Sequence, residues 1–215
     1  MFLDILAVLC LARNHLTSID TAQLPPGLKH VDVSLNVLIS ISEVHWPQML
    51  EKLDLAENKL TSLDCDRLPS RLMWLKLNNN EIASITGHSG RFVYLTNLAL
   101  CRNRLTTFEG LVPPPFVRQV KIAKNSFPTL QGLYLPDTTV NLDLSKNRFT
   151  SLRLNPFLRH LDLSECDIAS FTDTDLNKHL LKLNLRRATA KSSESPLLGF
   201  LCLHHRYFFL ASLIK

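Results

Sequence analysis

The sequence predicts an elongated solenoid in which short parallel β-strands stack into one curved sheet. Three observations support this prediction. Leucine makes up 44 of the 215 residues, about a fifth of the chain and well above ordinary usage. A pattern of leucine and asparagine returns along the chain, and its spacing is nearly constant. Such a period is typical of an array of small units, none of which can bury its apolar residues alone.

The pattern L-x-x-L-x-L-x-x-N-x-L, with other apolar residues allowed at the leucine positions, fits nine successive segments. The spacings between the asparagine positions are 22, 22, 22, 23, 22, 22, 19 and 22 residues. The last two of these positions hold Cys166 and Ala188. The others hold Asn14, Asn36, Asn58, Asn80, Asn103, Asn125 and Asn147. We therefore expect about nine repeats within residues 1–190.

Each unit contains a segment x-L-x-L-x that alternates apolar and polar residues, as a half-buried strand does. Leu53 and Leu55 are expected to point into the core, while Lys52 and Asp54 point outward. Parallel strands lie about 4.8 Å apart, so nine of them span roughly 40 Å. We expect these strands to form the concave side of the solenoid.

The asparagine column has a structural reason. After each strand the chain must turn inward, which leaves backbone N–H and C=O groups buried. A carboxamide has donors and acceptors that can satisfy these groups, and leaving them unpaired would be costly. We expect Cys166 to replace the amide in this column rather than to act as a nucleophile. Ala188 cannot replace it, so the column should end near that residue.

Because of this pattern, the segment 6–190 resembles an array of leucine-rich repeats. The resemblance covers roughly nine-tenths of the chain. The resemblance implies an α/β-type solenoid that curves as a right-handed horseshoe, with β-structure on its concave side. It also implies that the asparagine side chains stack as a ladder, in which cysteine is the usual alternative. A fold of this kind says much less about function.

The variable half of each repeat is short, with roughly eleven residues, which is too few for a long helix. Because proline fixes φ and lacks an N–H, it favours extended or polyproline II backbone. We predict a convex side of extended segments and 3₁₀ turns. Several repeats have a proline segment just before the strand, namely LPPGL at 24–28, WPQML at 46–50, LPSRL at 68–72 and LPDTT at 135–139. These segments resemble the short repeats of bacterial effector ubiquitin ligases and of some protist receptor-like kinases.

Residues 191–215 form a second region, which breaks the repeat and is rich in apolar residues. The segment 196–215 is long enough to cross a bilayer. His204, His205 and Arg206 lie in its middle, where charge is costly. Three interpretations stay open at this stage. The region is a C-terminal cap over the last strand, a membrane span, or the unnatural tail of a truncated gene product.

The cysteines favour a reducing compartment. All five lie in different repeats or in the tail, without paired spacing, and the sequence has neither Cys-rich caps nor an N-x-S/T sequon. Met1 to Leu11 is apolar enough to suggest a signal peptide. Against this interpretation, Leu6, Leu9 and Leu11 are already in repeat register and no basic residue precedes the apolar run. We expect a cytoplasmic protein, with membrane-associated or secreted as the alternatives.

The sequence contains no motif of a catalytic site. It lacks a Gly-rich phosphate loop, an H-E-x-x-H motif and a C-x-x-C pair. One aspartate slot recurs between the strand leucines, which we attribute to its solvent-facing position. This slot holds Asp32, Asp54, Asp143 and Asp162. We expect no enzyme activity, no cofactor and no metal site.

The concave sheet is the usual binding face of a solenoid. We expect Trp74 to anchor a protein partner, since tryptophan is enriched at binding hot spots. A basic band beside it favours an acidic partner. The net charge of +5 and pI near 9.0 fall short of a nucleic-acid signature, so we do not expect nucleic acid. The predicted binding residues are Trp74, Lys76, Asn97, Arg102, Gln119, Lys121, Lys124, Lys146 and His160.

The predicted function is therefore a non-enzymatic module that presents its concave sheet to a protein. Two alternatives stay open. The chain is a truncated ectodomain of a membrane receptor or receptor-like kinase, or it is the substrate-recognition arm of a ubiquitin ligase. The identity of the partner and the oligomeric state are not predicted.

Overall fold

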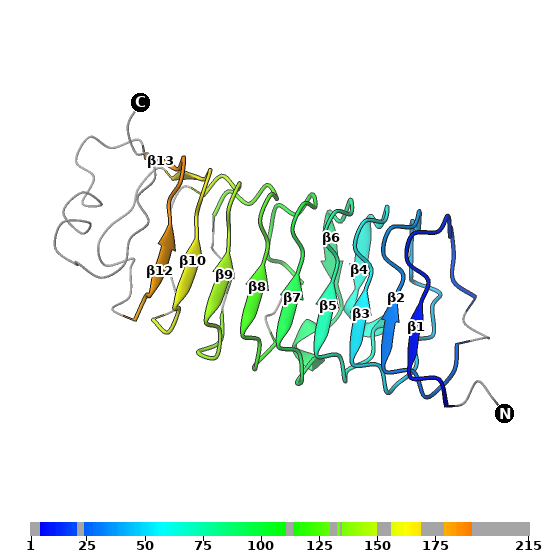
Figure 1. Ribbon diagram of the computed structural model, residues 1–215. Coiled ribbons are helices and arrows are strands. Elements are labelled where there is room, and N and C mark those ends of the chain that lie inside the picture. The colour runs from blue at the N-terminus through cyan, green and yellow to red at the C-terminus, as the bar shows by residue number, and fades with distance from the viewer. Residues whose placement is uncertain are drawn as a thin grey trace.

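A computed structural model describes residues 5–20, 24–110, 114–129, 133, 135–149, 156–168 and 179–190. Its main feature is a nine-stranded parallel sheet that runs the length of an elongated solenoid (Figure 1). In their order across the sheet, the strands are β1 (Val8–Cys10), β2 (His30–Asp32), β3 (Lys52–Asp54), β5 (Trp74–Lys76), β7 (Asn97–Ala99), β8 (Gln119–Lys121), β9 (Asn141–Asp143), β10 (His160–Asp162) and β12 (Lys182–Asn184).

Neighbouring strands in the sheet are one repeat apart, so equivalent residues lie side by side. Leu53 of β3 is aligned with Val31 of β2 and with Leu75 of β5. All three are buried, whereas Lys52 is exposed. The predicted alternation of inward and outward residues is thus confirmed, and the inward rows of successive repeats join into one continuous apolar core.

The asparagine column forms a ladder that joins each repeat to the one before it. Asn80 is representative: its Nδ2 donates to the carbonyls of Leu77 in its own repeat and Leu55 in the preceding one, at 3.1 and 3.0 Å. Its Oδ1 accepts the N–H of Leu60, also in the preceding repeat, at 3.0 Å. The same two bridging bonds recur at Asn36, Asn58, Asn103, Asn125 and Asn147.

Cys166 takes the amide's place in this column, as predicted. Its buried Sγ donates to the carbonyl oxygen of Leu144 at 3.2 Å, which is one of the contacts that an asparagine would make. Ala188 has no side-chain polar atom, so within the described residues Asn147 is the last amide of the ladder.

The residue before each ladder position has a left-handed backbone. Its φ lies between 54° and 60° in all nine repeats, although none of these residues is glycine. This conformation turns the chain inward, and it costs about 1 kcal/mol or more for a non-glycine residue. The backbone bonds and the adjacent ladder side chain hold it in place. Among these nine residues are Arg102, Lys124 and Lys146.

A second turn, which we call the pre-strand turn, precedes most strands. In it the backbone N–H of the fourth residue donates to the carbonyl of the first, as for Leu50 and Pro47 at 3.1 Å. Proline opens this turn in five described repeats, and Phe92 opens it in another. The sequence did not predict this β-turn, although a proline that is its first residue can keep the extended backbone that the sequence favoured. The first residue of the turn contributes only its carbonyl to the hydrogen bond, so proline, which lacks an N–H, can occupy that position.

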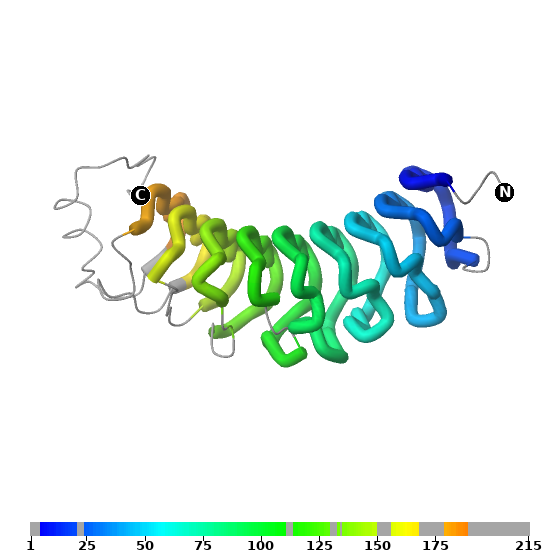
Figure 2. The backbone as a smooth tube through the Cα atoms, turned by 90° about the horizontal axis from the view of Figure 1, so that it is seen from below, coloured from blue at the N-terminus to red at the C-terminus, as the bar shows by residue number. Residues whose placement is uncertain are grey.

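The convex side consists of extended pieces and 3₁₀ turns, as predicted. Two small parallel sheets lie there, one of β4 (Ser62–Asp64) with β6 (Ser84–Thr86), the other of β11 (Asp167–Ile168) with β13 (Thr189–Ala190). The 3₁₀ turns are η3 (Cys65–Arg67) and η4 (Ser89–Arg91). Figure 2 shows the coils stacked along a shallow arc. The solenoid makes about seven turns, slightly fewer than the nine predicted units, although the sheet has nine strands.

The tail interpretations remain open, because residues 191–215 lie outside the described residues. In the part of the chain that is described, no helix has both the length and the apolar character that a bilayer span requires.

We predict that Asn80→Ala lowers the free energy of unfolding by about 2 to 4 kcal/mol, because it leaves the buried N–H of Leu60 without a partner and removes one of the two side-chain amide bonds that the carbonyls of Leu55 and Leu77 each accept. Urea unfolding followed by circular dichroism measures the change. Asn14→Ala is the matched control, since Asn14 is exposed and bonds only to carbonyls of its own repeat. Equal losses in the two variants would contradict the bridging role.

Candidate functional site

The concave face carries two rows of outward side chains, one on each side of the buried strand residue. The first row includes Trp74, Asn97, Gln119 and His160, and the second includes Lys76 and Lys121. The predicted residues Arg102, Lys124 and Lys146 are not on strands. They occupy the left-handed turns that follow the strands, so they lie along the margin of the concave face.

Trp74 is the largest apolar group on this face. Its side chain is 42% exposed on β5, and the ammonium of Lys52 on the neighbouring strand lies 5.3 Å from the ring centroid. A cation at this distance over an indole is attracted to its π-face. Met73, the preceding residue, is also exposed. The structure therefore presents an exposed aromatic ring with one cation already stacked on it.

The basic band is partly neutralised within the chain. The Lys76 ammonium lies 2.8 Å from Asp54 Oδ2, and the Lys146 ammonium lies 3.3 Å from Glu165 Oε1. Arg102, Lys121 and Lys124 form no ion pair with any described residue. These three cations are the part of the predicted band that has no ion pair among the described residues.

Two of the predicted amides bond to each other. The Asn97 Nδ2 donates to Gln119 Oε1 at 2.8 Å, and the Thr96 hydroxyl donates to Asn97 Oδ1 at 2.8 Å. This chain of bonds orders the middle of the first row between Trp74 and His160. The Gln119 Nε2 group makes no hydrogen bond with any of the described residues.

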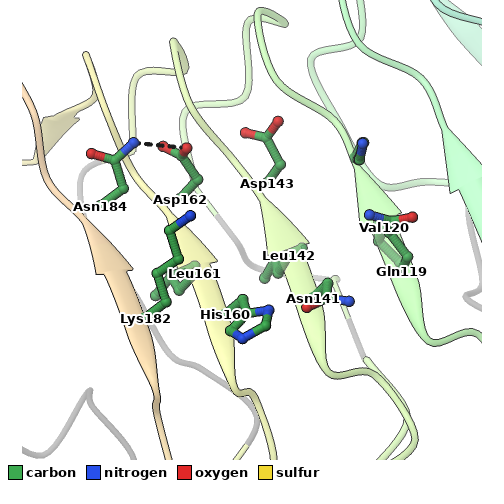
Figure 3. Close-up of a pocket in the computed structure, with 11 residues that line it drawn as sticks. Gln119, Val120, Asn141, Leu142, Asp143, His160, Leu161, Asp162, Lys182 and Asn184 are labelled. Atoms are coloured by element: carbon green, nitrogen blue, oxygen red, sulfur yellow. Dashed lines mark hydrogen bonds between the residues drawn. The ribbon is translucent and has the colours of Figure 1, made fainter. Parts of the chain in front are cut away.

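A shallow hollow of about 330 Å³ lies over β8, β9, β10 and β12 (Figure 3). His160 and Gln119 line it, together with Asn141, Lys121 and Lys182. Asn141 Oδ1 is buried there without a hydrogen-bond partner. The hollow contains predicted residues from the C-terminal half of the face, whereas Trp74 lies outside it on β5.

The recurring aspartates do more than face the solvent, because each of them accepts a backbone hydrogen bond. In each case Oδ1 accepts the backbone N–H two residues later, as Asp54 does from Ala56 at 3.1 Å. The same bond is made by Asp32, Asp143 and Asp162. In the three consecutive repeats between Asp54 and Asp143, this slot holds Lys76, Ala99 and Lys121, none of which can accept such a bond.

The cysteine thiols are poor candidates for nucleophiles. Burial raises the pKa of the Cys65 thiol to about 12 and that of Cys166 to about 11, and it also raises the pKa of Cys101. A thiol with a raised pKa stays protonated at neutral pH and reacts slowly. No group of three or more His, Cys, Asp or Glu side chains among the described residues could hold a metal ion.

Comparisons with known proteins place the fold. No family model and no curated protein matches the chain. Many solved structures match, among them the leucine-rich effector protein YopM of Yersinia pestis, at 27% identity and a TM-score of 0.74 over 90% of this chain and 51% of that one. The chain has the leucine-rich repeat fold.

Two further leucine-rich repeat structures show the same likeness. A protein of Leptospira interrogans is 24% identical, with a TM-score of 0.74 over 87% of this chain and 50% of that one. The leucine-rich repeat protein FLRT2, solved in a complex with Latrophilin 3 and Unc5D, is 23% identical, with a TM-score of 0.74 over 92% and 67%. The chain spans about half the length of the YopM and Leptospira proteins.

We predict that Cys65 and Cys166 resist alkylation in the folded repeat domain, because both thiols are buried and their pKa values are raised. Cys10 is exposed and should react first. Peptide mapping by mass spectrometry after a short iodoacetamide pulse at pH 8 measures the order. In urea the difference should vanish. Modification of Cys166 at the rate of Cys10 in the native protein would contradict its place in the ladder.

Proposed function

We propose that this chain is a non-enzymatic protein-binding module that uses its concave face. The observation that carries the proposal is the association of an exposed tryptophan with unpaired cations on and beside one hydrogen-bonded sheet. Trp74 and Lys121 are separated by two strand intervals, β5 to β7 to β8, which is about 10 Å. One partner surface of ordinary size reaches both residues.

The energetics favour Trp74 as the anchor. Covering the exposed 42% of its side chain removes about 100 Å² of apolar surface from water, which contributes about 2 to 3 kcal/mol. The free cations Arg102, Lys121 and Lys124 then select a partner that carries carboxylates, and they speed its approach. The partner that fits this face is an acidic protein surface with an apolar pocket or ridge.

The chemistry of the face supports binding rather than catalysis. Its regularly placed aspartates are committed to backbone N–H groups, and the buried cysteines are held protonated. The four cysteines that the structure describes are all free thiols. This supports a reducing compartment, and we propose the cytoplasm as the location.

We predict that Trp74→Ala combined with Lys121→Glu lowers the affinity for the partner at least tenfold, because it removes the anchor and reverses a charge. The partner is first identified by affinity capture with the wild-type chain, and then titrated by calorimetry against each purified variant. Circular dichroism checks that the variants are folded.

The matched control is Tyr94→Ala combined with Lys59→Glu. Both residues are exposed and neither lies on a strand of the concave sheet, so this variant should retain the wild-type affinity. Equal affinity of the Trp74 and Lys121 variant and the wild type would reject the concave docking surface.

A further inference from the structure

The exposed apolar side chains are concentrated on one edge of the solenoid. We define the pre-strand edge as the pre-strand turns together with the residue that follows each turn, at 25–29, 47–51, 69–73, 92–96, 114–118, 136–140, 156–159 and 179–181. Seven of the eleven large apolar side chains that are exposed in the described residues lie on this edge. They are Met49, Met73, Val93, Tyr94, Phe116, Phe157 and Leu181.

The most exposed aromatic residues on this edge hold equivalent positions in neighbouring repeats. Tyr94 and Phe116 each immediately precede the first leucine position of their repeat, and both are 57% exposed. Phe157 holds the same position two repeats further on, is 45% exposed and stacks on His179, with ring centroids 6.4 Å apart. A ring in this position is not needed by the fold, because Arg71 and Thr138 occupy it in other repeats.

The charges on this edge are mainly positive. Lys29 and Glu51 neutralise each other across 3.6 Å. Three arginines, Arg71, Arg118 and Arg159, form no ion pair with any described residue. Asp137 is the only other carboxylate among the residues of the edge. Exposed aromatic rings and unpaired guanidinium groups therefore lie together along this edge.

The geometry of the stack makes this edge long and even. Equivalent residues of stacked repeats follow one another along a single line. The strands that begin at this edge are those along the lower side of Figure 1, and Figure 2 looks onto that side. From β3 to β12 there are six strand intervals, or about 29 Å. An edge of this kind can touch an extended planar surface at several repeats together.

We propose that the pre-strand edge binds the surface of a membrane that contains anionic lipids. Tyrosine is favoured at the level of lipid headgroups, where its ring is buried and its hydroxyl is wet, and phenylalanine is favoured on the apolar side of the same boundary. Arginines beside them are attracted to the negative surface potential. A lipid surface needs no matching shape to contact a row of separate rings. It therefore suits this edge better than a partner with a single shaped pocket. This site is distinct from the proposed concave binding face and does not depend on it.

The test is flotation of the full chain with phosphatidylcholine vesicles that contain about 30% phosphatidylserine. The wild type should float with these vesicles. Tyr94→Ser combined with Phe116→Ser should lower the partition coefficient at least tenfold, because two rings no longer enter the headgroup layer. Arg118→Ser combined with Arg159→Ser should lower it about tenfold on these vesicles, and much less on pure phosphatidylcholine.

Matched controls lie away from the edge. Ile39→Ser removes an exposed apolar group, and Lys59→Ser combined with Arg13→Ser removes two exposed cations, all beyond the opposite ends of the strands. These variants should float like the wild type. Thermal melts exclude unfolding as the cause of any loss.

Two outcomes would overturn the proposal. The first is wild-type protein that does not float with the vesicles. If the Tyr94 and Phe116 variant then also loses binding to a protein partner, the edge is a protein interface instead. The second is flotation that the Tyr94 and Phe116 variant retains in full, since binding would then come from another part of the chain, such as the apolar segment 196–215.

Discussion

The hydrogen bonds of the ladder carboxamides fix everything else in this structure. Each ladder asparagine from Asn36 to Asn147 bonds to its own repeat and to the preceding one, so it closes a sharp inward turn and sets the distance between two coils at once. The strands follow from this constraint, because coils held at a constant spacing place equivalent residues side by side. The outward rows, and with them both candidate surfaces, inherit their alignment from the same bonds.

Much of the fold could be predicted from the sequence, because the period places residues in space. Leu53 and Leu75 are 22 residues apart and lie side by side, and Cys166 takes the ladder position that its spacing assigned. The proline turns could not be derived in this way. Proline restricts φ in the same manner in an extended segment and at the start of a β-turn, and only the bond from Leu50 to the Pro47 carbonyl distinguishes them.

The candidate site was predictable in outline, and the pairings within it were missed. Asp54 and Lys76 are also 22 residues apart, so the register alone places them on neighbouring strands in one row, and the structure joins them at 2.8 Å. The pre-strand edge was missed for another reason. A residue such as Phe116, which directly precedes a buried position, suggests a core residue when single positions are judged by hydrophobicity. Only its exposure in the assembled stack shows that it is a surface residue and not a core residue.

The aspartate slot gives an independent argument for the proposed concave binding face. In the two repeats on each side of the centre this slot holds an aspartate that accepts a backbone N–H, namely Asp32 and Asp54 on one side and Asp143 and Asp162 on the other, whereas the first repeat has Cys10 there. The three repeats at the centre give up that bond for Lys76, Ala99 and Lys121. In the middle one, the N–H of Cys101 is satisfied instead by Asn78 of the preceding repeat, at 2.8 Å. Departures from a local structural rule that cluster beside an exposed tryptophan are expected where a surface serves binding rather than stability.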